Sequence, residues 1–478
     1  MPGAPWLAAI AEDDQAPVYF LRIDGLSYDY STGPVKSAGT TKKVGYLHSI
    51  RGGGATVDLL TGVQTVQEVE CEVLDVNDEV TDVVAVRAAG APLTTLVNRK
   101  ATLYSGFRHL TEAEYEPRFT GRIRGTPWND NGTGYVFRLS DVGYMLDGRI
   151  MTGATEGTPA SIVGNVVNVY WSLLTGTFDT GHATFPLTSV SADGATSSAP
   201  TGLGIATALI NEDQLVAQRD TWHIQDTIRA DFVDSEDARA LLTAELFRAF
   251  QSFPAISGDG KLGLRFHVPS LPLSAAAAIS EDDVVEIHSW DPSYGDHLNK
   301  FTIKGNYSTW SKQFESTLYS LSDTADQAAT GETIEYLVES RWMRTEYDGA
   351  NLAWELANRM KVRCLHPPVP IEVTVNAHHL AVEQGDVVRV THPLLVDLFA
   401  GSRGVTDHMM TVLAIAPEWD TGNRRLTLLD TGGRRYGLIT GDAQASYAAS
   451  SVVDRETWFY ISNDSGVMSD GSDGYRFI

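Results

Sequence analysis

The sequence contains very little cysteine, with only Cys71 and Cys364 among 478 residues. The two are far apart and form no CxxC pair, so neither a disulfide framework nor a zinc site is indicated. Cys71 falls inside an alternating apolar pattern and is most simply a core residue. We therefore expect neither a metal ion nor a cofactor.

Positive charge is also scarce. The chain has 36 Lys and Arg against 61 Asp and Glu, which gives a formal net charge of −25. Proteins that hold nucleic acid by its phosphates need clustered Lys and Arg. The charge argues against that class, but not against a surface that DNA slides past without sticking.

Long hydrophobic runs are missing as well. No stretch approaches the length of a transmembrane helix, and the first residues, "MPGAPWLAAIAEDD", lack the basic region of a signal peptide. We expect a soluble chain that is folded in a cytoplasm and does not insert into a membrane. Its 43% hydrophobic content is enough for several packed cores.

Signatures of catalysis are absent too: the sequence has no HExxH, GxSxG or Walker motif. Gly202-Leu203-Gly204 follows a loop and lacks the third glycine of a dinucleotide site. We predict that the chain is not an enzyme. A carbohydrate-cleaving protein with two facing carboxylates remains an alternative, although the ten tryptophans are scattered.

What the sequence does contain is a series of strand patterns. In 66–76, Val69, Cys71 and Val73 alternate with glutamates, which places Glu68, Glu70 and Glu72 together on the opposite face. Further strands are predicted at 18–25, 100–106, 119–125, 134–141, 257–270, 283–290, 299–308, 371–377 and 385–392.

Helical patterns interrupt the strands at three places. The first helix is predicted from Thr158 as N-cap, with Pro159 at its first position, to Gly176 just past its end. The second spans 234–253, capped by Asp234 or Ser235. The third spans about 348–362 and stops before three prolines. Residues 176–204 are predicted to be loop or weak strand.

One hairpin pattern occurs twice. Residues 127–132, "PWNDNG", match 417–422, "PEWDTG", and both hairpins close on Asp-x-Gly, at 141–143 and 430–432. Each follows a strand and a long loop, at 100–118 and 385–408. Generic turn chemistry would produce some of this likeness by chance. The Pro and Trp before each turn favour a duplicated β module.

In this order of parts the chain resembles the central hub proteins of bacteriophage tails. The resemblance covers about residues 16–432 and includes "GDGKLGLRF" after a helix, a helix before "PPVPIEVTVNA", and "GDVVRVTHP" leading to the last hairpin. It implies two similar barrels per chain and a homotrimer, whose six barrels form a pseudo-sixfold ring on a hexameric tail tube. It also implies a virion location at the tail tip or baseplate.

The expected fold is a multi-domain, β-rich α+β protein with two similar small β-barrels and helix-containing intermediate domains. The predicted domains are an N-terminal barrel at 1–148, intermediate domains at 149–230 and 231–345, a second barrel at 346–432 and an extended arm at 433–478. The partners implied are the distal tail or tail tube protein, the tape-measure protein, and tail fibre, spike or receptor-binding proteins. Double-stranded DNA would pass through the lumen without specific binding.

Three sets of residues are candidate sites. Glu68, Glu70 and Glu72 form either a lumen surface or an ordinary solvated strand face. The segment 394–399, "LLVDLF", is placed outside regular strands, where it forms an interface or folds back over its own barrel. The tail either docks on a neighbour or frays. The interface candidates are Leu394, Leu395, Val396, Leu398, Phe399, Tyr475 and Phe477.

Two other functions remain open at this point. A carbohydrate-binding or carbohydrate-cleaving cell-surface protein would show aromatic platforms with opposed carboxylates and would act as a free chain. A distal tail ring protein would form a hexamer instead of a trimer.

Overall fold

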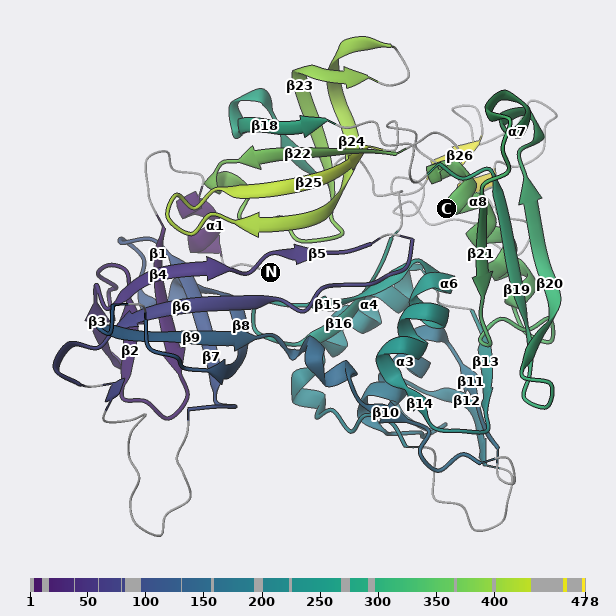
Figure 1. The fold of residues 1–478 in the computed structure, drawn as a ribbon, viewed down its shortest axis with the longest axis horizontal. Coiled ribbons are helices and arrows are strands. Elements are labelled where there is room, and N and C mark those ends of the chain that lie inside the picture. Colours follow the sequence, from purple (N-terminus) through teal and green to yellow (C-terminus); the bar gives the residue numbers. More distant parts are fainter. Residues whose placement is uncertain are drawn as a thin grey trace.

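The computed structural model describes most of the chain. Its described residues are 4–10, 17–37, 39–58, 60–78, 80–81, 96–129, 131–155, 159–192, 201–222, 226–267, 276–290, 297–364, 368–397, 401–430, 459–461 and 475–477. These residues form several sheets with helices packed among them (Figure 1), so the prediction of a multi-domain, β-rich α+β protein is confirmed.

The first sheet has eight strands, and its core consists of the inward-facing apolar residues of those strands, including Val69, Cys71 and Val73. In sheet order the strands are β3 Thr41–Val44, β2 Tyr28–Ser31, β1 Val18–Ile23, β7 Lys100–Gly106, β8 Glu116–Gly125, β9 Gly134–Ser140, β6 Glu68–Leu74 and β4 Leu47–Gly52.

The second sheet has seven strands and a core of its own. In order they are β17 Ala277–Ile279, β23 Val387–Asp397, β24 Ser402–Pro417, β25 Arg424–Asp430, β22 Val369–Val375 and β18 Val284–Trp290, while β5 Ala55–Thr56 pairs with β24. Because β17 and β18 come from 277–290, this sheet reaches beyond 346–432, the range predicted for the second barrel.

The two sheets share one strand order. The run β1-β7-β8-β9-β6-β4 corresponds to β17-β23-β24-β25-β22-β18, both in the chain and across the sheet. Every neighbouring pair within β7-β8-β9-β6-β4 and within β23-β24-β25-β22-β18 is antiparallel. The two sheets differ at the first strand of the run, because β1 pairs antiparallel with β7 and β17 pairs parallel with β23.

Irregularities in the pairing also recur at equivalent places. The register of β8 against β9 shifts between Ile123 and Gly125, and that of β24 against β25 shifts between Val412 and Ala414. The register of β4 against β6 and that of β18 against β22 both shift near the start of the outer strand. The register of β7 against β8 and that of β23 against β24 both shift within the ladder. Bulges are specific features of a ladder, so their recurrence strengthens the case for a duplicated module.

A third, larger core is formed by residues from the range 142–364 and lies beside the two sheets (Figure 1). Its strands are β10 Arg149–Ile150, β14 Glu236–Asp237, β11 Ala160–Gly164, β12 Leu187–Ala192, β13 Ile228–Phe232, β15 Ser252–Ile256, β16 Leu262–Phe266, β19 Lys300–Ser308, β20 Gln313–Ser322 and β21 Glu335–Glu339. Its helices are α3 Val166–Thr175, α4 Glu212–Trp222, α5 Ala238–Leu241, α6 Arg248–Phe250, α7 Thr324–Thr330 and α8 Gly349–Cys364.

Two short elements lie at the ends of the chain. Helix α1, Ala4–Ile10, buries Trp6 against Phe20 and Phe107 of the first half. Strands β26 Phe459–Ile461 and β27 Tyr475–Phe477 pair with each other in the region predicted to be an extended arm.

The first helix begins later than predicted. Residues 160–164 form β11, which pairs with β12 on one side and β13 on the other, so the helical prediction for them was wrong. Helix α3 starts after Asn165, whose side chain accepts a hydrogen bond from the Val167 N–H at 3.0 Å, and it ends on Gly176 in the left-handed conformation, as predicted. Thr158, the predicted N-cap, lies outside the described residues. Pairing on both edges outweighs the helical periodicity of this short β-branched run.

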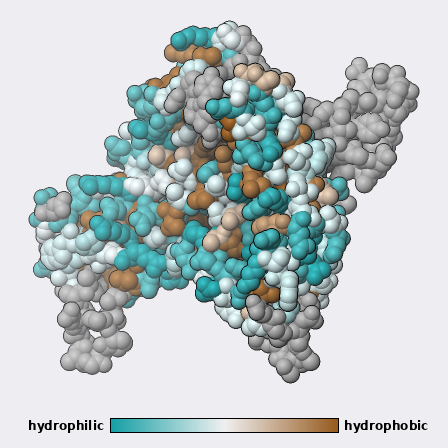
Figure 2. Space-filling model, turned by 45° about the vertical axis from the view of Figure 1, so that its right-hand side comes forward, coloured by the Kyte–Doolittle hydropathy of each residue, from teal (hydrophilic) through white to brown (hydrophobic). Residues whose placement is uncertain are grey.

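The second helix also has a different cap. Asp237, not Asp234 or Ser235, caps it, because the Asp237 carboxylate accepts from the Ala240 N–H at 2.8 Å. The helix then widens into a π-helical segment, Leu242–Phe247, before α6. Its apolar residues Ala238, Leu242, Leu246 and Phe250, which recur at helical spacing, are buried in the third core. The surface in Figure 2 is largely hydrophilic, with hydrophobic residues in separate patches.

Candidate functional site

The hairpin between β24 and β25 reaches from the second sheet onto the first. The indole N–H of Trp419 donates to the Gly52 carbonyl at 2.8 Å, and its ring meets Tyr19 edge-on at 5.4 Å. Gly53 has φ +82°, and a Cβ there would lie 2.9 Å from the Trp419 ring. A glycine is therefore needed where the tryptophan docks, both for the backbone angle and for the space.

Main-chain pairing between a segment of the first half and the second sheet strengthens this junction. Strand β5 leaves the first sheet after β4 and pairs with β24, so that Ile415 faces Ala55 and Ala414 faces Thr56 (Figure 1). Beyond it, the Gln64 side-chain amide donates to Gln384 at 2.8 Å, and both residues are buried. The two sheets are thus joined by main-chain pairing and a buried hydrogen bond as well as by side-chain packing.

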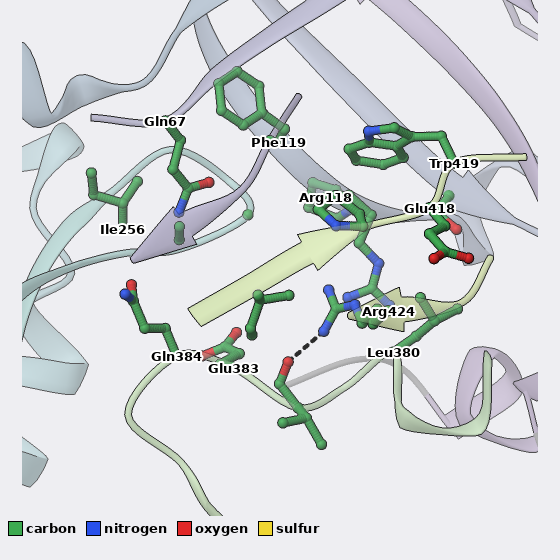
Figure 3. Close-up of a pocket in the computed structure, with 18 of the residues that line it drawn as sticks. Gln67, Arg118, Phe119, Ile256, Leu380, Glu383, Gln384, Glu418, Trp419 and Arg424 are labelled. Carbon is green, nitrogen blue, oxygen red and sulfur yellow. Dashed lines mark hydrogen bonds between the residues drawn. The ribbon is translucent and has the colours of Figure 1, made fainter. Parts of the chain in front are cut away.

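A pocket lies at this junction, and we take it as the candidate functional site (Figure 3). It has a volume of about 130 Å³ and is lined by the first sheet, the second sheet and the hairpin β15–β16. Its polar walls include Arg118 on β8, Arg424 at the start of β25, and Arg265 on β16. Its apolar walls include Phe119 and Leu380.

Burial dominates the electrostatics of the pocket. Burial, with the nearby Arg424 charge, lowers the pKa of Arg118 to about 9. Burial likewise lowers the pKa of Arg424. Burial raises the pKa of Tyr19 to about 12, even though both arginines favour its ionised form. The site therefore concentrates positive charge in a poorly solvated space.

Arg265 differs from the other two arginines because it is paired. It forms an ion pair with Glu383, and its Nη1 lies 2.8 Å from Asp386 Oδ1. These contacts tie β16 to the turn that precedes β23. Arg118 instead has its guanidinium carbon 4.0 Å from the centre of the Trp6 ring, and Arg424 donates to the Val382 carbonyl.

The arginine and tyrosine side chains of this pocket are groups that can donate hydrogen bonds to an anion, and Glu383 and Glu418 also line it. In the part of the chain that the structure describes, no group of three or more His, Cys, Asp and Glu side chains is placed to hold a metal ion. Nor does any described helix combine the length and apolar character required to span a bilayer.

The predicted apolar loop 394–399 is partly a strand, so its placement outside regular strands was wrong. Strand β23 continues to Asp397, because Val396 and Asp397 pair with Arg403 and Ser402 of β24. Leu394 is 59% exposed, whereas Leu395 is buried in the second core, and Val396 is half-buried. Leu398 and Phe399 lie outside the described residues.

The three predicted acidic residues do share one face of β6. Glu68 is exposed, and Glu70 pairs with Arg138 of β9 at 2.9 Å. Glu72 accepts hydrogen bonds from Asn129 at 3.0 Å and Ser49 at 2.9 Å, and these hold its pKa below the ordinary value despite partial burial. Glu70 and Glu72 thus also bridge β6 to neighbouring segments.

The remaining predicted residues, Tyr475 and Phe477, belong to β27, and their side chains lie outside what the structure describes. Two further features were not predicted from the sequence. The pocket arginines come from segments about three hundred residues apart, so no local pattern reveals them. Trp310 lies at the tip of the β19–β20 hairpin and is 96% exposed. Its position between two strand patterns could have indicated an exposed tryptophan in a turn.

No protein-family model matches the chain, and no curated protein matches it. Solved structures do resemble it in fold. The 43 kDa tail protein of prophage MuSo2 from Shewanella oneidensis is 12% identical, with a TM-score of 0.43 over 87% of this chain and 99% of that one.

Two further solved structures have similar values. A tail protein from Neisseria meningitidis MC58 is 10% identical, with a TM-score of 0.42 over 87% of this chain and 97% of that one. Prophage tail protein gp18 from Listeria monocytogenes EGD-e is 10% identical, with a TM-score of 0.35 over 79% of this chain and 94% of that one.

Proposed function

We propose that the chain is a structural virion protein, the central hub of a phage tail tip or baseplate. In this role it caps or extends the tail tube, joins it to receptor-binding or spike components and lines the DNA exit channel. The observation that carries the proposal is the duplicated sheet, with its shared strand order and recurring register shifts. Two similar sheets per chain are what the resemblance to hub proteins implies.

Two similar sheets in one chain would help copies of the chain to assemble into a ring. A threefold ring is built from head-to-tail contacts, so each chain needs two different complementary surfaces. Within one chain, the second sheet already reaches the first through Trp419. We propose that the hairpin of the first sheet makes the corresponding contact with the second sheet of the next chain. Trp128 in that hairpin is 58% exposed, and the edge strand β18 exposes Val285 and Trp290 by 59% and 37%.

The acidic balance fits a channel for DNA. A negative lumen repels phosphates and keeps the genome from adhering during passage. We assign Glu68, Glu70 and Glu72 to that lumen. The outward position of these side chains on β6 supports the assignment, and their hydrogen bonds are compatible with it.

The apolar residues near the end of β23 are the proposed contact with other tail proteins. Leu394 is exposed and Val396 is half-buried, so both can contribute to this contact, whereas Leu395 is buried and cannot. We group Leu398, Phe399, Tyr475 and Phe477 with them. The partners would be the distal tail or tube protein, the tape-measure protein, and fibre, spike or receptor-binding proteins. The proposed domains are those predicted from the sequence, with strands 277–290 added to the second sheet.

The mass of the purified chain in solution tests the proposal. Light scattering should give about three times the 51.9 kDa of one chain, either alone or after addition of a tail partner. A hexamer would point to a distal tail ring protein instead. A chain that stays monomeric with virion partners would contradict the hub assignment. Trp128→Ser should weaken the trimer, whereas the same change at the fully exposed Trp310 serves as a control for loss of a surface tryptophan.

A further inference from the structure

The junction pocket contains two arginines, each of which has at least one buried N–H donor that the described protein does not use. In the described structure, Nε and Nη2 of Arg118 and Nε of Arg424 are buried and have no hydrogen-bond partner. Both side chains extend into the pocket, one from each sheet (Figure 3). A buried donor without an acceptor costs free energy, and a charged one costs more. The fold therefore leaves a place that an acceptor would stabilise.

The acidic side chains around the pocket make ion pairs and hydrogen bonds with groups other than Arg118 and Arg424, although the Glu383 charge favours the charged form of both arginines. Glu383 pairs with Arg265, as does Asp386 at 2.8 Å. Glu418 accepts from the Thr421 hydroxyl at 3.2 Å. Among the described residues, no ion pair joins Arg118 or Arg424 to a carboxylate. Besides burial, the Arg424 charge contributes to the lowered pKa of Arg118, whereas the Glu383 charge acts to raise the pKa of both arginines without forming an ion pair with either in the described structure.

We infer that this pocket binds a small tetrahedral oxyanion, phosphate or sulfate, between Arg118 and Arg424. The inference concerns a site that the proposed hub function does not require, and it stands whatever the oligomeric state is. The bound anion would accept the unused N–H groups from both sheets at once. It would therefore act as a charged link across the junction.

Size and chemistry agree with this ligand. One water molecule needs about 10–15 Å³ of such space, so a cavity of about 130 Å³ holds an ion of five heavy atoms. Guanidinium groups present paired donors that match the oxygens of phosphate and sulfate. Burial and the Arg424 charge lower the pKa of Arg118 to about 9, which still leaves it charged at neutral pH. The apolar walls reduce screening and strengthen the attraction.

Thermal unfolding in the presence of defined anions tests the inference. The full chain, purified without phosphate or sulfate, is heated with sodium phosphate, sodium sulfate or sodium chloride at matched ionic strength. We expect the melting temperature to rise saturably with phosphate and sulfate and not with chloride, because an anion that binds only the folded chain stabilises it by mass action. Calorimetric titration with phosphate should give one site per chain. Equal shifts with all three salts would overturn the inference.

Substitutions on neighbouring residues locate the site. Arg424→Gln and Arg118→Gln should lower phosphate affinity at least tenfold. Arg425→Gln is the matched control, because Arg425 is the next residue on β25, has 45% of its side chain exposed and pairs with Glu372. Without phosphate, the two pocket variants should be at least as stable as the parent chain, since each removes a buried charge that has unused donors and no ion-pair partner among the described residues. If both keep the parent response to phosphate, the anion binds elsewhere and the inference is wrong.

Discussion

Trp419 of the second sheet lies edge-on against Tyr19 of the first, with ring centroids 5.4 Å apart and ring planes at 81°. The contact joins residues four hundred positions apart and is fixed by a hydrogen bond from the indole to the Gly52 carbonyl. Edge-on aromatic pairs are favourable beyond the area they bury. This pair therefore fixes the position of one sheet on the other.

Trp419→Ala should destabilise the junction by about 2 kcal/mol, less than for a fully buried tryptophan, because the ring is half-buried. Urea unfolding followed by circular dichroism measures the change. Trp128→Ala is the matched control: its ring is 58% exposed, and the loss in the isolated chain should be about 0.5 kcal/mol. Equal losses in the two variants would contradict the assigned role of Trp419.

The second sheet should become less stable as pH rises through the folded pKa of His408, which lies above the ordinary value of about 6.5. His408 lies 2.7 Å from Asp430, and both are buried. Burial lowers the pKa of His408, but the hydrogen bond to Asp430 and its charge raise it to a net value above the ordinary one. A raised folded pKa adds stability below the unfolded value of about 6.5, and that stability is lost as pH rises through the folded pKa.

His408→Gln should remove this dependence, and the free energy of unfolding measured from pH 5 to pH 9 would show it. His48→Gln, at an exposed position on β4, is the control and should keep the parent profile. Parallel profiles for the parent and the His408 variant would contradict the prediction.

Leu394 and Leu395 should have opposite effects when substituted. Leu394→Glu should change the stability of the single chain by no more than about 0.5 kcal/mol and weaken self-association or partner binding at least tenfold. Leu395→Ala should destabilise the chain by about 2–5 kcal/mol, because its side chain fills the second core. Light scattering and urea unfolding separate the two effects. Unchanged association of the Leu394 variant would remove it from the proposed interface.

Reversing the charges of Glu68, Glu70 and Glu72 to lysine should slow genome ejection from otherwise normal particles. Losing the exposed Glu70–Arg138 pair should cost about 1 kcal/mol or less. Glu72→Lys also removes the acceptor of the Asn129 and Ser49 hydrogen bonds, so the folding of the variant and its assembly into particles are checked first. Ejection kinetics measured on assembled particles would show the delay. A control variant carries the same reversals at exposed acids outside the first sheet, at Asp179, Asp213 and Glu315. Equal ejection rates would exclude a lumen role.

The duplicated module was accessible from the sequence because its signals are local. Pro, Trp and Gly mark each hairpin turn, and alternation over 66–76 separates buried Val69 from exposed Glu68. The start of the first helix was not accessible, since β11 exists only because two distant strands pair with it. The same holds for 394–397, where pairing with 402–405 extends β23.

The pocket could not be predicted for a related reason. In the sequence, Arg118 and Arg424 look like ordinary strand residues. Their guanidinium groups become buried only because the two sheets pack together. Sequence periodicity reports which face of a strand is buried, but not which faces from different sheets meet. Residues that act across the junction therefore require the structure.

Strand β5 has a consequence for how the chain can fold. Ala55 and Thr56 are synthesised early, yet their partners Ala414 and Ile415 emerge from the ribosome some 360 residues later. Closing so long a loop is entropically costly, so this ladder forms after the two sheets have folded. The two sheets are therefore connected by main-chain hydrogen bonds only once β24 has been synthesised. A chain that ends before residue 414 would lack the β5–β24 pairing.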